Sequence, residues 1–506
     1  MASETEVLIV GAGPTGLVLA LFLQRLGVSF RIIDGAASPG ETSRALAVHA
    51  RTLEFYDQIG LAGAVIVRGV RIEAVGMWAR GRARARATFG DIGKGLSPYP
   101  YALVFPQDEH ERLLIDRLAE RGVEVERPLS LAGFEETKGG TAARLIAADG
   151  AEEQVEAKFI AGCDGARSRV REVFGSGFPG GTYSRMFYVA DVEASGPIVN
   201  GDLNIGLDAA DFLAVFPLKG AGRVRLVGDL NREGSEDLSF DDVGHAVIDR
   251  LGIEIKAVNW FSSYRVHHRV AAKWRSGPAF LLGDAAHIHS PVGGQGMNTG
   301  IGDAVNLAWK LAAVLKGAAG ETLLDTYEPE RIAFAHRLIA STDRAFKMIS
   351  RDDALARFAR LVVVPAILPP LTRLPAFRRL LFRTVSQINV NYQDQALAAG
   401  EAGKVKAGDR LPWVKAADNF APLRSLAWRG QVHGDPEAGL TQACAQAGLP
   451  LDCFAWTADA RQAGLHKDAF HLVRPDGYVA LAAEDAAPAA LAQYQARHEL
   501  RFQQGD

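Results

Sequence analysis

The first 34 residues contain the pattern that most limits what this chain can fold into. A short apolar segment, Glu6–Val10, precedes GAGPTG at positions 11–16, which leads into an apolar helical run over Leu17–Leu26. A second apolar segment, Phe30–Ile33, then ends at Asp34. This order predicts a strand, a glycine-rich turn, a helix and a parallel strand, which is the unit that binds dinucleotides.

Each position of the glycine motif has a physical reason. Gly11 permits a tight turn, Gly13 lets the backbone approach a pyrophosphate, and Gly16 lets the helix pack closely on the strand. Pro14 suits the first helical turn, whose free N–H groups attract phosphates. Asp34 would accept hydrogen bonds from a ribose. The motif does not separate FAD from NAD(P), and a glycine-rich turn without a ligand is the alternative.

The bulk composition excludes several other classes of protein. At 506 residues the chain should hold two to four domains, and its net charge of −3 gives no general attraction to nucleic acid. Its three cysteines, Cys163, Cys444 and Cys453, have no metal-ligand or CxxC spacing. That usage indicates a reducing, cytoplasmic location and no dithiol redox centre. We read Cys163 as a small buried apolar residue.

No stretch reaches the roughly 18 uninterrupted apolar residues that a membrane span needs, so no integral membrane association is expected. The most apolar later stretch, Leu361–Leu371, is broken by three prolines and is followed by arginines. A packed helical hairpin is the favoured reading of this stretch, and contact with a membrane surface is the alternative.

The segment GDAAHIHSPVGGQGMN at positions 283–298 raises the question of a metal site. Asp284, His287 and His289 are close in sequence, and His267 and His268 precede them. However, an HxH pair on an irregular loop does not present both rings on one fixed face, as two histidines one helical turn apart do. We therefore expect no metal here, and a glycine-rich cofactor turn instead.

Four motifs in order carry a resemblance to a known family. They are GAGPTG, ETSRALAVHARTLE at 41–54, CDGARSRVR at 163–171, and the segment that begins at Gly283. Together they resemble the single-component FAD-dependent aromatic hydroxylases, which include para-hydroxybenzoate, phenol and aromatic-polyketide hydroxylases. The resemblance covers residues 5–345. In the tail, AGDRLPWV (407–414) and HLVRPDGYVAL (471–481) resemble the C-terminal thioredoxin-like domain of the phenol and polyketide branch.

The resemblance implies an α/β fold built from several units. A Rossmann-like FAD-binding domain would occupy residues 1–178 and 266–345, and a mixed or antiparallel substrate sheet would be inserted at 179–265. A helical connector would follow at 346–400, and a thioredoxin-like domain at 401–506.

The same resemblance implies where non-covalently bound FAD would be held. Gly11 to Gly16 and Asp34 would hold its ADP half, Arg44 its phosphates, and Asp284 its ribityl chain. Gly293–Asn298 would wrap the flavin's pyrimidine edge. The full set of implied cofactor residues is Gly11, Gly13, Pro14, Thr15, Gly16, Asp34, Arg44, Gln107, Asp164, Gly283, Asp284, Pro291, Gly294, Gly296, Met297 and Asn298.

The implied reaction is hydroxylation of a phenolic or polyketide-like aromatic with NADPH or NADH and O2, through a flavin hydroperoxide. Baeyer–Villiger oxygenation, epoxidation, an FAD-dependent reductase without oxygen insertion, and a non-catalytic flavin-binding module stay open. No catalytic base is assigned, and a homodimer is an open expectation. Candidates for the substrate site, with sheet packing as the alternative, are Tyr183, Arg185, Phe212, Phe216, Tyr264 and His289.

Arg80, Arg82, Arg84 and Arg86 alternate with small residues, which predicts four guanidinium groups on one face of a strand. A solvated sheet edge that discourages aggregation is the favoured reading. A site for the phosphates of NADPH is the alternative.

Overall fold

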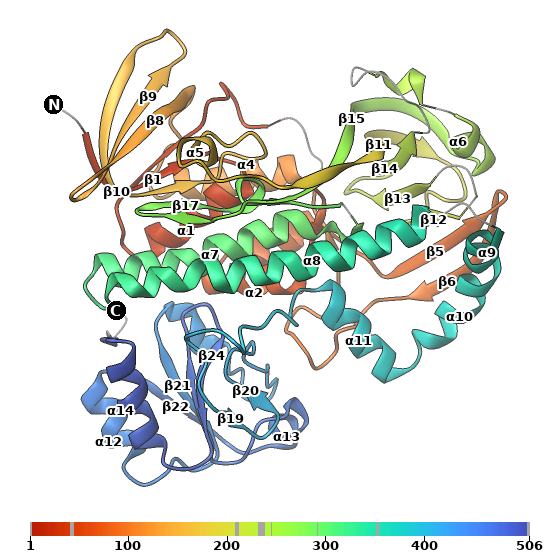
Figure 1. The fold of residues 1–506 in the computed structure, drawn as a ribbon. Helices are drawn as coiled ribbons and strands as arrows, with labels where there is room; N and C mark the ends of the chain where they lie inside the picture. The colour runs from red at the N-terminus through yellow and green to blue at the C-terminus, as the bar shows by residue number, and fades with distance from the viewer. Residues whose placement is uncertain are drawn as a thin grey trace.

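The computed structural model describes residues 3–40, 45–207, 212–230, 238–243, 245–290, 292–350 and 354–502. Two large sheets lie side by side in the upper half of Figure 1, and a third, smaller sheet lies below them. Long helices run between the upper sheets and the lower unit. The functional site depends on how these layers meet.

The first sheet contains the predicted strand–helix–strand unit. Strand β1 (Ser3–Val10) pairs in parallel with β2 (Phe30–Ile33) and β10 (Glu152–Gly162), and helix α1 (Pro14–Arg25) connects β1 to β2. The second half of β1 is fully buried, as expected for a parallel strand covered on both faces. Strand β17 (Ala279–Leu281) pairs with the other side of β10. The prediction for residues 6–34 is therefore confirmed.

The second sheet has eight strands and is mostly antiparallel, with one parallel pair between β5 and β12. Its order is β18-β15-β11-β14-β13-β12-β5-β6. The strands are β5 (Ala74–Ala79), β6 (Arg82–Thr88), β11 (Gly180–Ser195), β12 (Leu203–Gly206), β13 (Leu213–Pro217), β14 (Arg223–Leu230), β15 (Glu254–Val270) and β18 (His287–Ile288). This confirms a mixed sheet. The sheet also includes β5 and β6, which come from an earlier part of the chain than the predicted insertion at 179–265. The residue boundaries of the units stay a prediction.

The arginine-rich segment forms the end strand of that sheet. Arg82, Arg84 and Arg86 alternate along β6 and are exposed, whereas Arg80 lies in the preceding turn with a φ of 54°. The expectation that all four share one strand face is wrong for Arg80, because the chain reverses at Arg80–Gly81 through two residues with positive φ.

Helices α7 (Gln295–Leu315) and α8 (Tyr327–Ser350) form the layer beneath the sheets, together with α2 (Ala50–Gln58) (Figure 1). Helix α7 begins two residues before the predicted start at Met297, and Ile301, Val305 and Ala308 form its buried face as predicted. The chain continues through α9 (Ala354–Phe358), a π-helical turn (Ala359–Val363), α10 (Val364–Leu371) and α11 (Pro375–Val385).

The C-terminal unit is a four-stranded sheet with the order β22-β21-β23-β24. Its elements are β21 (Arg429–His433), α12 (Leu440–Ala447), β22 (Leu451–Phe454), α13 (Ala458–Ala463), β23 (Phe470–Val473), β24 (Val479–Ala483) and α14 (Ala487–Arg497). Strands β21 and β22 are parallel, and β23 and β24 are antiparallel to their neighbours. This connectivity is compatible with the thioredoxin-like assignment, which stays a prediction.

Candidate functional site

The glycine-rich turn between β1 and α1 has one open position and two closed ones. A Cβ atom at Gly11, where φ is 102°, would lie 2.4 Å from the carbonyl oxygen of Cys163, and one at Gly16 would lie 2.0 Å from the carbonyl oxygen of Gly11. At Gly13 a Cβ would meet no atom within 4 Å. Gly13 therefore borders free space at the N-terminus of α1, where a dinucleotide motif places its pyrophosphate.

The carboxylate of Asp34 lies beside this turn at the end of β2. It accepts hydrogen bonds from the backbone N–H groups of Ala12 (2.7 Å) and Ala36 (2.8 Å), and it lies 3.2 Å from Arg127. The same Arg127 guanidinium donates to the carbonyl oxygens of Ala36 and Ser38. Sequence reasoning missed Arg127, because its partners are mostly backbone oxygens and no local pattern marks it.

Asp164 lies on the other side of the same turn and is incompletely satisfied. One carboxylate oxygen accepts from the N–H groups of Arg169 (2.7 Å) and Val170 (3.1 Å), while the buried second oxygen has no hydrogen-bond partner. Burial raises the pKa of Asp164 and outweighs these hydrogen bonds. A buried acceptor without a donor is costly. This orphaned oxygen is therefore what a missing ligand would be expected to leave at the site.

The segment at Gly283 packs directly on α1. At Gly283 a Cβ would lie 2.6 Å from the hydroxyl of Thr15, and at Gly300 in α7 it would lie 2.3 Å from the same hydroxyl. Thr15 thus fills the space between three chain segments. Asp284 is exposed between the buried residues Gly283 and Ala285. The arrangement leaves the Asp284 side chain at the surface of the cradle, as a ligand to a ribityl hydroxyl requires.

Arg171 connects this segment to the Asp164 segment. Its guanidinium donates to the carbonyl oxygens of Ala285 (2.9 Å) and Ala166 (2.8 Å), and it stacks on the ring of Phe178. Sequence reasoning quoted this residue within a motif but gave it no role. The two loops that border the cradle are therefore fastened to each other by one buried cation.

The N-terminus of α7 forms the third border. Gly293 and Gly294 have φ values of 78° and 61°, which glycine adopts without strain, and α7 begins at the next residue. The side chain of Asn298 donates to the carbonyl oxygens of Ala47 and Gly294 and accepts from His49 N and the hydroxyl of Thr52. Through those bonds Asn298 ties the turn to the segment Ala47–Thr52, and the first backbone N–H groups of α7 have no partner within the helix itself, as in any α-helix.

The two histidines of this segment have different surroundings. His287 is buried, bonds to Asp303 at 2.8 Å and stacks on Trp274. His289 bonds to the carbonyl oxygen of Ser290 at 2.8 Å, and its ring lies 3.8 Å from where a Cβ on Gly296 would be. Burial lowers the pKa of His289 to about 4. In the described part of the chain no group of three or more His, Cys, Asp or Glu side chains could hold a metal ion.

The segment after residue 44 is held by Gln107 at the start of α4 (Gln107–Ala119). Gln107 accepts from the backbone N–H of Ala45 at 3.2 Å and donates to Glu111 at 2.8 Å. Arg225, fully buried in a bidentate pair with Asp191, also donates to the Ala45 carbonyl oxygen. Arg44 and Pro291, both expected to contact FAD, lie outside the described residues.

The structure brings together three of the five substrate-site candidates on the sheet. Tyr183, Phe212 and Tyr264 pack around Phe187 and Val266 on neighbouring strands β11 and β15 and the start of β13. Phe216 belongs instead to a different apolar cluster, with Leu46 and Val104. Arg185 is part of β11, and its side chain lies outside the described residues. Beyond this cluster β15 pairs with β18, with Arg269 opposite Ile288, the residue before His289.

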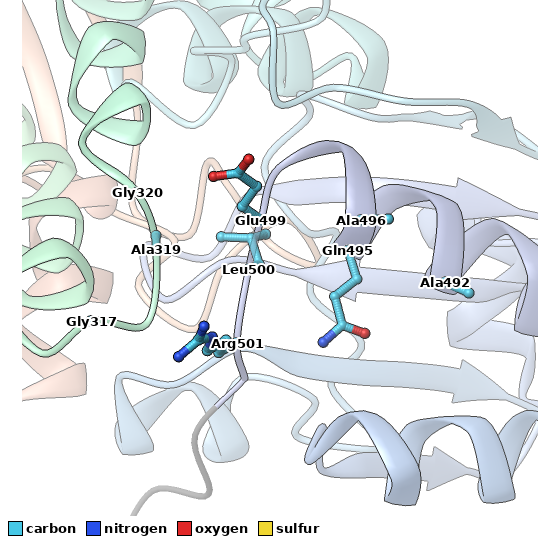
Figure 2. A pocket seen from close by; sticks show the side chains of 9 residues that line it. All are labelled: Gly317, Ala319, Gly320, Ala492, Gln495, Ala496, Glu499, Leu500 and Arg501. Carbon is cyan, nitrogen blue, oxygen red and sulfur yellow. The ribbon is translucent and has the colours of Figure 1, made fainter.

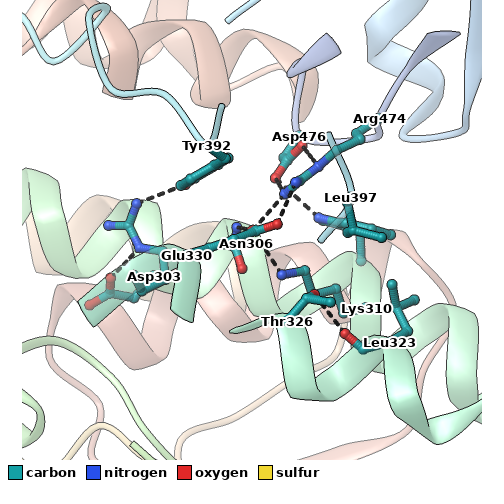
Figure 3. A network of polar contacts seen from close by, with 12 residues as sticks. Asp303, Asn306, Lys310, Leu323, Thr326, Glu330, Tyr392, Leu397, Arg474 and Asp476 are labelled. Carbon is teal, nitrogen blue, oxygen red and sulfur yellow. Dashed lines mark hydrogen bonds and ion pairs between the residues drawn. The ribbon is translucent and has the colours of Figure 1, made fainter. Parts of the chain in front are cut away.

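A buried polar network supports the cradle from below (Figure 3). Asp303 of α7 accepts from Gly283 N, from His287 and from Arg331 of α8, and Arg331 in turn donates to the hydroxyl of Tyr392. The second part of the network is centred on Glu330, the residue before Arg331 in α8, which accepts from Asn306, Lys310 and Arg474. Since Arg474 also pairs with Asp476, the C-terminal unit joins the same network.

The charges in this network balance. Asp303, Glu330 and Asp476 oppose Arg331, Lys310 and Arg474. Burial opposes the charge on Glu330, but Arg474 and Lys310 outweigh it and lower the pKa of Glu330 to about 2. Burial lowers the pKa of Lys310 to about 8. Sequence reasoning missed the network, because Asp303, Lys310 and Glu330 find their partners on other elements.

The cavity shown in Figure 2 does not belong to this cradle. It has a volume of about 640 Å³ and lies between the turn after α7, at Gly317–Gly320, and the end of α14, at Gln495–Arg501. The cavity therefore lies where the FAD-binding unit contacts the C-terminal unit, away from the turn at Gly13.

Comparison with known proteins agrees with the geometry of the cradle. A family model described as FAD binding domain matches residues 4–342. The chain is 36% identical over 405 residues to 6-methylpretetramide 4-monooxygenase of Streptomyces rimosus, which covers 79% of this chain and 72% of that protein. It is 32% identical over 500 residues to a flavin-dependent monooxygenase of Mycobacteroides abscessus, with 94% and 97% covered.

A third relative is pentachlorophenol 4-monooxygenase of Sphingobium chlorophenolicum, which is 33% identical over 434 residues, or 81% of this chain and 76% of that protein. Among solved structures, the OxyS anhydrotetracycline hydroxylase from Streptomyces rimosus superposes with a TM-score of 0.78 at 28% identity. That superposition covers 97% of this chain and 98% of OxyS. The chain therefore belongs to the FAD binding domain family and, with these relatives, to its flavin-dependent monooxygenases, with FAD as its cofactor.

Proposed function

We propose that this protein hydroxylates an aromatic substrate, phenolic or polyketide-like, with NAD(P)H and O2. The balanced reaction is substrate–H + O2 + NAD(P)H + H⁺ → substrate–OH + H2O + NAD(P)⁺. The observation that carries the proposal is the meeting of three distant segments at Thr15, namely Gly11–Gly16, Gly283 and helix α7 at Gly300, beside free space at Gly13 at the N-terminus of α1.

The residues of the cradle have separate roles in this proposal. Gly13 and the start of α1 receive the pyrophosphate of FAD, Asp34 receives the ribose, and Asp284 receives the ribityl chain. The first N–H groups of α7 would hold the flavin's pyrimidine edge, because a helix N-terminus favours negative charge by roughly 0.3–2 kcal/mol. When bound, FAD supplies hydride acceptance and the activation of dioxygen.

The protein contributes position, charge and the exclusion of water. The aromatic surface of Tyr183, Phe212 and Tyr264 offers rings against which a planar substrate can stack. His289 is neutral above a pH of about 4, since burial lowers its pKa, so its ring adds no positive charge at neutral pH. The unpartnered oxygen of Asp164 is available to the cofactor or to the nicotinamide donor.

The substrate class rests on the relatives, whose names specify 6-methylpretetramide and pentachlorophenol. We further propose a cytoplasmic location, which the three unpaired cysteines support. A choice between NADPH and NADH, and the presence of a homodimer, are left to experiment.

The test is to purify the protein, record its flavin spectrum, and follow NADH and NADPH oxidation in air against a panel of phenols and polyketide-like aromatics. Oxidation stimulated by substrate, with a product heavier by one oxygen atom, is the expected result. Reduction of an acceptor without oxygen uptake would instead identify a reductase. Absence of turnover across the panel would favour a non-catalytic flavin-binding module.

A further inference from the structure

Helices α9–α11 carry an apolar surface that the described part of the chain does not cover. Neither the π-helical turn nor α10 has a buried residue, although α10 reads VPAILPPL. Of the nine large apolar side chains that stand out as exposed in the described structure, seven lie here: Leu355, Phe358, Val362, Val364, Ile367, Leu374 and Leu380. A concentration of exposed apolar side chains on one short stretch of chain is typical of an interaction surface.

The same segment is strongly basic. Between residues 354 and 393 the chain has no aspartate or glutamate and six arginines, whereas the whole protein has a net charge of −3. The arginines are Arg357, Arg360, Arg373, Arg378, Arg379 and Arg383. The exposed apolar side chains therefore belong to a stretch of chain whose ionised side chains are all positive, and positive charge of this kind attracts an anionic surface.

Strand β6 extends this patch. Helix α10 lies against β6, the end strand of the eight-stranded sheet, at the right of Figure 1. Arg82 and Arg84 are exposed on β6, while Arg86 pairs with Asp202. We call residues 354–385 together with Arg82 and Arg84 the basic apolar face.

The dimensions of this face fit the surface of a bilayer better than its interior. In the described residues no single helix is long and apolar enough to cross a membrane, but the pair Ala359–Leu371 and Pro375–Val385, bent by 108°, has the length and composition to do so together. At about 1.5 Å per residue the two arms are only about 20 Å and about 17 Å long, against a hydrocarbon core of about 30 Å. Three arginines on the second arm also oppose deep burial.

The face is fixed to the protein at one end. Phe382 of α11 is fully buried against Ala50, Ile92 and Ile388. The elements that precede this anchor along the chain, α9, α10 and the first turn of α11, stay at the surface. This is the arrangement of an amphipathic segment that lies in the plane of a membrane with its apolar side chains inserted.

We propose that the basic apolar face docks the protein on anionic lipid bilayers. Exposed apolar side chains insert at the interface, and the arginines contact lipid phosphates, with their apolar stems extended along the bilayer boundary. A second copy of this chain fits the face poorly, since a two-fold contact would place six arginines against six others. Docking of this kind is reversible and places the flavin domain beside a lipid phase.

The test uses the FAD-loaded protein and vesicles of phosphatidylcholine alone or with about one-third phosphatidylglycerol. Co-sedimentation with the anionic vesicles and little with the neutral ones is expected, and about 1 M salt should weaken it because the Debye length falls to about 3 Å. The Arg373→Gln/Arg379→Gln double variant should bind the anionic vesicles roughly 30-fold more weakly, at about fivefold per arginine. The Phe358→Ser/Ile367→Ser double variant should bind the anionic vesicles at least about tenfold more weakly.

Matched controls lie outside the face. Val67→Ser removes an exposed apolar side chain from α3 (Ala62–Arg68), and Arg144→Gln removes an exposed arginine from β9 (Gly140–Ala147). Both should bind vesicles like the unaltered protein, and all variants should keep their flavin content and unfolding temperature. Equal binding to neutral and anionic vesicles, or unchanged binding by both double variants, overturns the proposal. The proposal is also overturned if the protein is an oligomer that Phe358→Ser/Ile367→Ser dissociates while vesicle binding stays unchanged. That result would make the face a contact between copies of this chain.

Discussion

At the scale of single residues, the cradle is defined by what glycine permits. Gly11 and Gly13 belong to one turn, yet only Gly11 is surrounded by protein atoms. The motif could be read from sequence because its geometry is local to six residues. Arg127 and Arg171 could not, since each contacts backbone oxygens that are distant along the chain.

This contrast predicts different outcomes for two substitutions in the turn. Gly13→Val should leave the unfolding free energy of the FAD-free protein within about 1 kcal/mol of the original and abolish FAD binding, because the new side chain fills the free space. Gly11→Ala should destabilise the FAD-free protein by about 3 kcal/mol or more, through a clash with Cys163 and an unfavourable positive φ. Urea unfolding and flavin titration measure both effects. Normal FAD affinity in Gly13→Val would exclude that space as the pyrophosphate site.

A second prediction at this scale concerns His49, which is buried beside Gly293 and Gly294. Burial lowers the pKa of His49 from 6.5 to about 4, so the folded state binds the proton more weakly than the unfolded state. The stability associated with neutral His49 is complete above pH 6.5 and is lost as pH falls toward 4, for a total of about 3 kcal/mol. His49→Gln should remove this dependence. The difference in unfolding free energy between His49→Gln and the original protein should be constant above pH 7. Between pH 6.5 and 4 it should shift in favour of the variant. A difference that stays constant over the whole range would contradict the lowered pKa of His49.

At the scale of elements, α7 and α8 join the cradle to the C-terminal unit through buried charge. Spacing alone predicted the apolar face of α7, because Ile301, Val305 and Ala308 recur at helical intervals. The same spacing gives no reason to bury Asp303 or Lys310 in that helix. Their burial depends on Arg331, Glu330 and Arg474, which come from α8 and from beyond β23.

Two isosteric substitutions should separate the two halves of this network. Asp303→Asn and Glu330→Gln each leave a buried charge without its counter-charge, which costs about 3–5 kcal/mol of unfolding free energy. Only Asp303→Asn should also weaken FAD binding, because Asp303 positions Gly283 and His287. Thermal unfolding and flavin titration of both proteins provide the comparison. Equal loss of FAD affinity in Glu330→Gln would mean that the network transmits its effect as one unit.

At the scale of the whole molecule, buried ion pairs help to join the C-terminal unit to the FAD-binding unit. Arg410 pairs with Glu54 of α2, and Arg474 pairs with Glu330 of α8, all four side chains being buried. The order of motifs predicted a succession of units, whose boundaries stay a prediction. The contribution of β5 and β6 to the substrate sheet did not, since strand pairing across more than a hundred residues has no local signal.

Removal of the C-terminal unit should therefore damage the FAD-binding unit. A chain that ends at Val390 would expose Glu54 and Glu330 without Arg410 and Arg474, and we expect it to unfold at lower temperature and lose FAD. Adding Glu54→Gln and Glu330→Gln to the shortened chain should not restore that loss, because Arg51 and Lys310 would then lose their own carboxylate partners. Differential scanning calorimetry of the two shortened chains is the measurement. A shortened chain as stable as the full one would show that the docking ion pairs contribute nothing.

The central claim is that the cradle serves oxygen insertion into an aromatic ring. Turnover under ¹⁸O2 with an accepted aromatic substrate, followed by mass spectrometry of the product, tests it most directly. The account predicts one ¹⁸O atom in each product molecule and one NAD(P)H consumed for each, with neither effect in Gly13→Val. A product without ¹⁸O, formed while NAD(P)H is consumed, would contradict it.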